Sequence, residues 1–173
     1  MAHEGLSRAA PATGVLLRAY LAARYRVHLG HGEWLALVVG RPAPAELART
    51  FPAASGSPLT LVTGWNPQSR PQPAASNLAA DAALRAELDA LHRPVLRTTS
   101  GDVDGHWEEP GWLVAGLDTA TADRLARRYG QAGLLHWRPG DPVRLRMYRT
   151  PPSGAAADAD ARWVDWVLET PAR

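Results

Sequence analysis

The chain of 173 residues is long enough to form one domain with a sizeable core, and its hydrophobic fraction of 46% argues against extensive disorder. The absence of cysteine excludes a disulfide framework and a thiolate zinc site, and the apolar runs are too short to span a bilayer. The formal net charge is only +2 and lysine is absent, so the arginines alone do not indicate a nucleic-acid partner. With no signal-peptide layout at the N-terminus, these features predict a cytoplasmic protein without a membrane partner.

The N-terminal part is predicted to add a helix and a strand to the main domain. Residues 1–12 are rich in alanine and interrupted by proline, so we expect a loose tail. Apolar residues at helical spacing predict a helix over 15–25, and the apolar run 34–39 predicts a buried strand. A short helix is expected over 45–50.

The central part shows a recognisable order of elements between residues 59 and 137. The patterns predict a strand, a helix, two strands, a helix and a strand, over 59–65, 77–91, 94–99, 112–117, 119–129 and 134–137. This is the order of the ferredoxin-like split βαβ unit, so we predict an α+β fold with helices on one face of the sheet. Ser76 or Asn77 is expected to cap the first helix, Asp118 or Thr119 the second, and Gly130 to end it.

The C-terminal part begins with a strand over 143–148, in which apolar residues alternate with arginine. We assign residues 13–150 to a single α+β domain and residues 151–173 to a linker and a C-terminal segment. The apolar residues of 163–168 predict an added edge strand or a short helix. Such a segment is expected to pack on the core or on a second copy of the chain, which would then be a homodimer.

One candidate site lies where the strand over 59–65 ends. Asn66 offers amide donors and an acceptor, and Ser69 adds a hydroxyl, at a sheet end where ligand sites are common. Asn before Pro67 is equally typical of a simple turn, so both interpretations stay open. Under the first, Asn66→Ala should leave the fold intact and abolish ligand binding.

A second candidate is the stretch from Gly101 to Pro110, which contains Trp107 and Glu109. It lacks the full signature of a calcium loop, and a hairpin loop is the simpler interpretation. An acid–base role for Glu109 would require partial burial to shift its pKa. The histidines are scattered, so the sequence indicates no metal site and no other cofactor.

The two stretches, together with Asn77, the run Leu113–Leu117 and the sequence Tyr129-Gly130-Gln131, resemble the motif series of DUF3293, a bacterial family of unknown function. The resemblance extends from about Tyr20 to Val143, with departures at Gly64, Gly111, Trp112 and Ala132. It carries no activity with it. It implies that six polar and aromatic residues form one constellation, namely Asn66, Ser69, Asn77, Trp107, Glu109 and Gln131.

Two functions follow from these patterns. In the first, the protein binds a polar small molecule: Asn66, Ser69, Asn77 and Gln131 orient it, Trp107 stacks on it, and in an enzyme Glu109 acts as acid or base. In the second, the protein is a non-catalytic interaction or regulatory domain, which its seven tryptophans would suit. A concave pocket would favour the first function, and a flat face exposing Trp163 or Trp166 the second.

Overall fold

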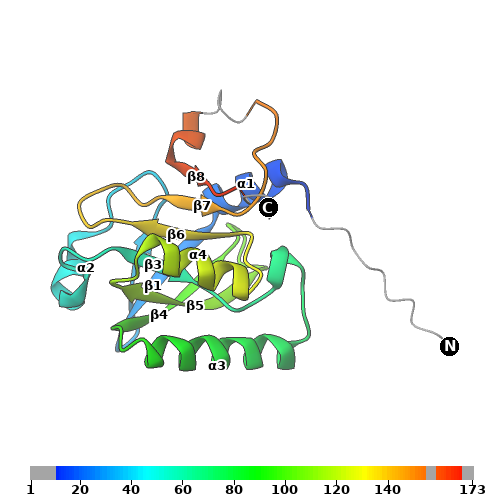
Figure 1. Cartoon of the computed structure of the whole chain (residues 1–173). Helices are drawn as coiled ribbons and strands as arrows, with labels where there is room; N and C mark the ends of the chain where they lie inside the picture. The colour runs from blue at the N-terminus through cyan, green and yellow to red at the C-terminus, as the bar shows by residue number, and fades with distance from the viewer. Residues whose placement is uncertain (1–10, 155–158, 169–173) are drawn as a thin grey trace.

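A computed structural model describes residues 11–154 and 159–168, which form a mixed α+β fold around one eight-stranded sheet (Figure 1). The described residues contain four α-helices, α1 (Thr13–Ala22), α2 (Ala45–Thr50), α3 (Ala74–Ala90) and α4 (Thr119–Arg128). Short 3-10 turns lie at η1 (Pro52–Ala54), η2 (Pro67–Ser69) and η4 (Ala159–Trp163). The strands, in sheet order, are β2 (Glu33–Leu37), β1 (Arg24–Gly30), β4 (Val95–Gly101), β5 (Glu108–Ala115), β3 (Leu59–Val62), β6 (Gly133–Trp137), β7 (Leu145–Met147) and β8 (Val164–Trp166).

Both faces of the sheet are buried, because alternate residues of its central strands contribute to two hydrophobic clusters. In β3, Leu61 belongs to the cluster that α1 and α2 cover, whereas Val62 belongs to the cluster under α3 and α4. Leu113 and Val114 of β5 divide in the same way. The prediction that the two helices of the split βαβ order cover one face of the sheet therefore holds for α3 and α4. The other face is covered by α1 and α2.

The sheet curls until the chain beyond its first edge meets the chain before β7. The backbone N–H of Gly40, which follows β2, donates to the carbonyl oxygen of Val143 at 2.8 Å, and the N–H of Val143 donates to Arg41 at 2.9 Å. These bonds join the chain after β2, the first strand of the sheet order, to the chain before β7, the last strand but one. The curled sheet thus encloses the larger of the two clusters, and α1 lies against that inner side.

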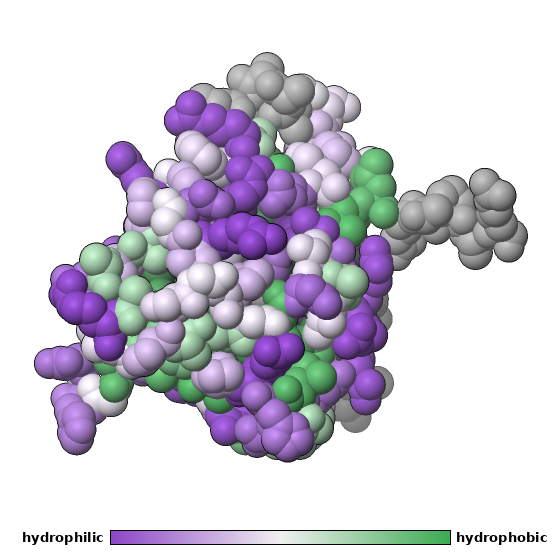
Figure 2. Space-filling view, turned by 60° about the vertical axis from the view of Figure 1, so that its left-hand side comes forward, coloured by the Kyte–Doolittle hydropathy of each residue, from purple (hydrophilic) through white to green (hydrophobic). Residues whose placement is uncertain are grey.

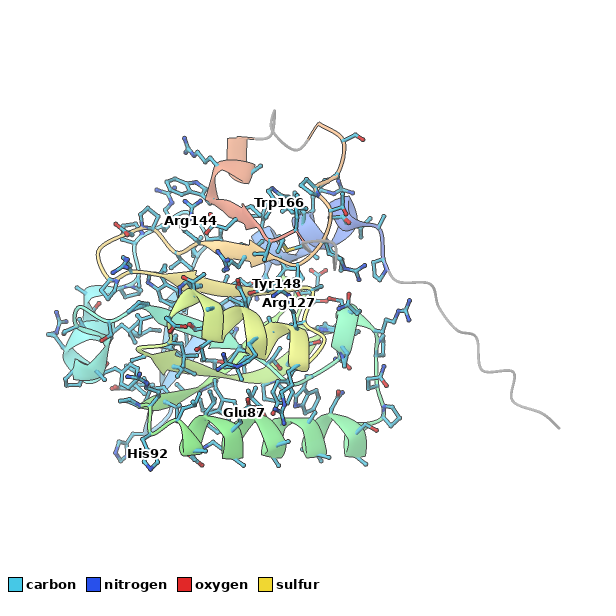
Figure 3. The ribbon with its side chains drawn as sticks, in the orientation of Figure 1. Glu87, His92, Arg127, Arg144, Tyr148 and Trp166 are labelled. Carbon is cyan, nitrogen blue, oxygen red and sulfur yellow. The ribbon has the colours of Figure 1, made fainter. Side chains whose placement is uncertain are left out.

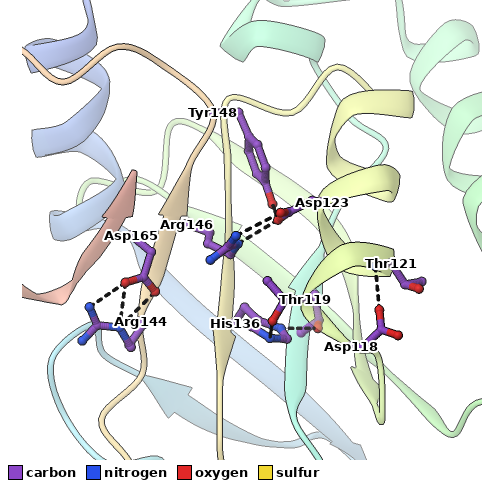
Figure 4. Close-up of polar contacts among 10 residues, drawn as sticks. Asp118, Thr119, Thr121, Asp123, His136, Arg144, Arg146, Tyr148 and Asp165 are labelled. Carbon is purple, nitrogen blue, oxygen red and sulfur yellow. Dashed lines mark hydrogen bonds and ion pairs between the residues drawn. The ribbon is translucent and has the colours of Figure 1, made fainter. Parts of the chain in front are cut away.

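The C-terminal segment pairs with the sheet as a parallel strand beside β7. Arg144 donates to both carboxylate oxygens of Asp165, with Nη2 to Oδ1 at 2.7 Å, while Trp166 packs against the inner cluster (Figures 3 and 4). On the next strand position facing α4, Arg146 pairs with Asp123.

The N-terminal segment differs from the sequence-based prediction. The predicted helix over 15–25 ends at Ala22, and a strand that was not predicted, β1, begins at Arg24 and forms a hairpin with β2. The apolar spacing misled because Tyr25, four residues after Leu21, continues the helical pattern while also belonging to the alternating pattern of the strand. Tyr25 still contacts the helix, since its hydroxyl donates to the carbonyl oxygen of Tyr20 at 2.8 Å.

Two of the predicted helix boundaries are confirmed and one is wrong. Asp118 caps α4 by accepting from the backbone N–H of Thr121 at 2.7 Å, and Gly130 follows that helix with a φ of +61°. The helix predicted to begin at Ser76 or Asn77 begins at Ala74, directly after Pro73, and no side chain caps it. Within the described residues, no helix is long and apolar enough to cross a membrane.

The contact between Gly40 and Trp163 predicts a stability difference between two glycines of positive φ. A β-carbon on Gly40 would lie 2.7 Å from the Trp163 ring, whereas one on Gly30 would meet nothing within 4 Å. We expect Gly30→Ala to lose about 1 kcal/mol of unfolding free energy through backbone strain alone. Gly40→Ala should lose at least about 2 kcal/mol, because the ring must also move. Urea unfolding measures both, and equal losses would show that Trp163 does not pack on Gly40.

Candidate functional site

Three segments that are distant in sequence meet at one end of the sheet because β3 is antiparallel to both of its neighbours. Val62, at the end of β3, lies opposite Trp112 near the start of β5, and Leu61 lies opposite Leu135 of β6. The residues that follow β3 therefore lie beside those that begin β5 and those that precede β6. This pairing brings the two candidate stretches of the sequence into one site.

The loop after β3 is held by reciprocal hydrogen bonds between two buried asparagines. The backbone N–H of Asn66 donates to Asn77 Oδ1 at 2.9 Å, and Asn77 Nδ2 donates to Asn66 Oδ1 at 2.9 Å. Asn66 Oδ1 also accepts from the backbone N–H of Gln72 at 2.9 Å. Asn77, in the first turns of α3, thus ties the helix to the loop, which is the role it has in place of helix capping.

The same loop holds three non-glycine residues in the left-handed region. Asn66, Gln68 and Ser69 have φ values of +45°, +58° and +54°. Asparagine tolerates this conformation better than glutamine or serine does. The neighbouring contacts maintain it, since the backbone N–H and the side-chain Nε2 of Gln68 both donate to the carbonyl oxygen of Gly130, at 2.7 and 2.8 Å. Such strained backbone clusters at functional sites.

Glu109, the second residue of β5, carries the carboxylate of the site. Its Oε1 accepts from Asn66 Nδ2 at 2.7 Å and from Trp107 Nε1 at 2.8 Å. Among the described residues, its Oε2 has no hydrogen-bond partner. Burial raises the pKa of Glu109 above the ordinary value, although the two donated hydrogen bonds act in the opposite direction.

A cavity of about 360 Å³ lies between α1 and the inner side of the sheet, at the end where these segments meet. Its walls are mainly apolar, from residues of α1, β3 and β6. The polar groups that line it include Tyr20, Thr63, Ser69, Trp107, Glu109 and Gln131. A small organic molecule with an apolar body and one or two polar groups would fit such a space.

Tyr20 of α1 is one of the polar residues of the cavity that the sequence did not indicate; Thr63, Ser100 and Asp102 are the others. Its hydroxyl lies 3.5 Å from Ser69 Oγ, and its ring covers Gly133, where a β-carbon would lie 3.2 Å from Cε1. Burial raises the pKa of Tyr20; the Glu109 charge acts in the same direction, whereas the Ser69 hydrogen bond and the Arg149 charge act against it. In the sequence, Tyr20 is one more apolar position on a helix face, and no signal there separates it from a core residue.

The predicted residues divide into those at the cavity wall and those behind it. Ser69, Trp107, Glu109 and Gln131 line the cavity, whereas Asn66 and Asn77 form the layer behind Glu109. The wall position of Gln131 does not leave its amide nitrogen free, because Nε2 donates to the carbonyl oxygens of Trp65 and Tyr129 at 3.0 and 3.2 Å. Among the described residues, no group of three histidine or acidic side chains is placed to hold a metal ion.

The fold and the site define an α+β protein with one ligand-sized cavity and a half-buried carboxylate at its wall. The model of the family DUF3293, described as a protein of unknown function, matches residues 62–134, which confirms the resemblance seen in the sequence. The matched segment contains all six residues of the expected constellation, whereas Tyr20 lies outside it. The comparisons with curated proteins and with solved structures found no match.

Asn66→Ala should destabilise the protein, in contrast to the expectation from sequence alone. The change removes an acceptor shared by two donors and a donor to Glu109, and it puts alanine at a φ of +45°. We expect a loss of about 2–4 kcal/mol in unfolding free energy. Gln72→Ala is the matched control, because the loop uses its backbone N–H and its side chain is exposed. Equal stability of the two variants in urea unfolding would contradict the structural role of Asn66.

Glu109 should give the stability of the protein a particular pH dependence. Because its pKa in the folded protein lies above the ordinary value of 4.5, the folded state binds this proton more tightly than the unfolded chain does. The resulting stabilisation is full below the ordinary pKa and is lost as the pH rises through the folded pKa. The unfolding free energy of the wild type minus that of Glu109→Gln should therefore fall as the pH rises above the ordinary value of 4.5. A difference that rises over this range would mean that the pKa is lowered instead.

Proposed function

We propose that this protein binds a small organic molecule in the cavity between α1 and the sheet, and that Glu109 Oε2 accepts a hydrogen bond or a proton from it. The observation that carries the proposal is that only one of the two carboxylate oxygens of Glu109 accepts hydrogen bonds from the described residues. One oxygen is held by Asn66 and Trp107, while the other has no partner among the described residues at the wall of a cavity of about 360 Å³.

The surroundings of Glu109 support a preorganised site. The carboxylate cannot rotate without breaking two hydrogen bonds, and Asn66 is itself fixed by the buried Asn77. A polar group that is oriented before the ligand arrives costs less to order on binding. The raised pKa of Glu109 also brings it closer to the range in which a carboxyl group can act as a general acid or base. Catalysis by Glu109 is accordingly part of the proposal.

Trp107 supports a stacking role at the rim of the cavity. Its side chain is 37% exposed, and its ring is held by the hydrogen bond from Nε1 to Glu109. A fixed, partly exposed indole offers a flat apolar surface at a low entropic cost. An aromatic or planar ligand could therefore contact Trp107 with its face and Glu109 with its donor group.

The alternative interaction function has less support from the tryptophans that motivated it. Trp163 packs against Gly40 and Trp166 against the inner cluster, so both are partly buried within the chain. On the face drawn in Figure 2, hydrophilic residues are interspersed among hydrophobic ones. A protein–protein contact surface would be expected to gather apolar and aromatic side chains in one patch.

The architecture that we propose for residues 59–137 is the ferredoxin-like split βαβ unit. Its support is the sheet order β4-β5-β3-β6 with antiparallel pairing throughout, in which α3 and α4 connect strands that are not neighbours. A cytoplasmic location is proposed on the absence of cysteine.

A fragment screen by ligand-observed NMR tests the proposed function. The change Ala19→Phe introduces a ring at an exposed position of α1 that lines the cavity, and Ala79→Phe makes the same change on the exposed side of α3. Fragments that bind the wild type should lose at least about tenfold in affinity in Ala19→Phe, because the ring occupies their space, and should be unaffected in Ala79→Phe. Those with an N–H or O–H donor should also weaken in Glu109→Gln. Binding that survives Ala19→Phe, or no binding by any fragment, would overturn the proposal.

A further inference from the structure

Arg149, two residues after β7, has a buried edge that no group of the described residues uses. Its Nε and Nη2 atoms are both inaccessible to solvent and have no hydrogen-bond partner in the part of the chain that the structure describes. These two nitrogens form one edge of the planar guanidinium, whose N–H bonds point in the same direction and match the two oxygens of a carboxylate or phosphate. A buried donor without a partner is costly, because it has lost its hydration and gained nothing in return.

The same chain shows twice what this edge of an arginine is used for. Arg144 binds Asp165 through Nε and Nη2, at 3.0 and 2.7 Å, and Arg146 binds Asp123 through the same two atoms at 2.7 and 2.9 Å (Figure 4). The three arginines lie close together in the sequence: Arg144 directly before β7, Arg146 within it and Arg149 two residues after it. Two of them receive a carboxylate from a neighbouring element, whereas Arg149 receives none from the described residues.

Arg149 lies next to the cavity wall but is not one of its lining residues. The register that places Gly133 opposite Met147, continued by two residues, places Gln131 of the wall opposite Arg149. Tyr20 lines the cavity and packs over Gly133, where the Met147 side chain of β7 also makes contact. The backbone N–H of Tyr148 donates to Ala132, which fixes the start of β6 beside the residues that lead to Arg149. The electrostatic effect of Arg149 on the Tyr20 hydroxyl agrees with this position.

We propose that the ligand of this cavity carries an oxyanion, a carboxylate or a phosphate ester, which binds the Nε–Nη2 edge of Arg149. This inference rests on the proposed function and specifies its ligand class. The oxyanion lies at the Tyr20 end of the cavity, the apolar body lies along α1, and a donor group reaches Glu109 at the other end. The side chain of Tyr20 must shift for the oxyanion to reach the guanidinium, so Arg149 becomes accessible as the ligand enters.

The test compares benzoate, phenyl phosphate and the neutral benzamide in ligand-observed NMR titrations at neutral pH. At least one of the two anions should bind the wild type about tenfold or more tightly than benzamide, as expected for hydrogen bonds to a charged group. Whichever anion shows the preference identifies the oxyanion. Arg149→Met should abolish the preference without weakening benzamide.

A stability measurement keeps the test independent of the choice of probe. Arg149→Met removes a guanidinium edge that has no partner, so its unfolding midpoint in urea should equal or exceed that of the wild type. Arg146→Met is the matched control: it leaves Asp123 without its cation, so the midpoint should fall. A fall in Arg149→Met as large as in Arg146→Met would show that Arg149 has a structural partner and would overturn the inference.

The two proposals fail in different ways. If benzamide binds, is blocked by Ala19→Phe and is equalled by both anions, the cavity binds ligands but Arg149 does not select an oxyanion, and only this inference falls. If none of the three probes binds and the fragment screen is also empty, both proposals fall together.

Discussion

The closure between the chain after β2 and the chain before β7 is the constraint on which the rest of the structure depends. Hydrogen bonds at Gly40 and Val143 bring the chain after β2, the first strand of the sheet order, to the chain before β7, the last strand but one. The inner side of this curled sheet is covered by two short helices, α1 of ten residues and α2 of six. The space that α1 leaves is the cavity, which therefore results from the curl and not from a missing side chain.

In this curled sheet, the backbone conformation of the loop after β3 orients the carboxylate of Glu109. The antiparallel pairing of β3 with β5 places Asn66 beside Glu109, and the left-handed conformation of Asn66 turns its amide toward that carboxylate. Asn77 then satisfies both the backbone and the side chain of Asn66. The contact between Asn66 and Glu109 therefore depends on the loop after β3, on β5 and on α3. A change in any of these three segments would be expected to alter the pKa of Glu109.

Much of the fold could be predicted from the sequence, because most helices and strands show clear apolar periodicity. The residues that begin and end α4 also act only on their neighbours in the chain. Asp118 and Gly130 act through their immediate neighbours, and the family motifs already grouped the six residues of the site. Tyr25 shows where this reasoning fails, since it fits the helix pattern and the strand pattern alike. Tyr20 could not be assigned to the site either. Its place beside Gly133 depends on the curl of the sheet, which no local pattern records.

Glu109 at the cavity wall and Arg149 next to the wall are of opposite charge, and yet they form no ion pair among the described residues. Glu109 instead receives neutral donors, an amide and an indole, which orient the carboxylate without cancelling its charge. Arg144 and Arg146 show that nearby positions of the chain are readily neutralised by aspartate. A direct pair of Glu109 with Arg149 would tie the start of β5 to the end of β7 across the cavity and fill it with their side chains. Keeping the charges apart leaves the Tyr20 hydroxyl under the influence of both and leaves the Glu109 carboxylate at the wall of a mainly apolar space.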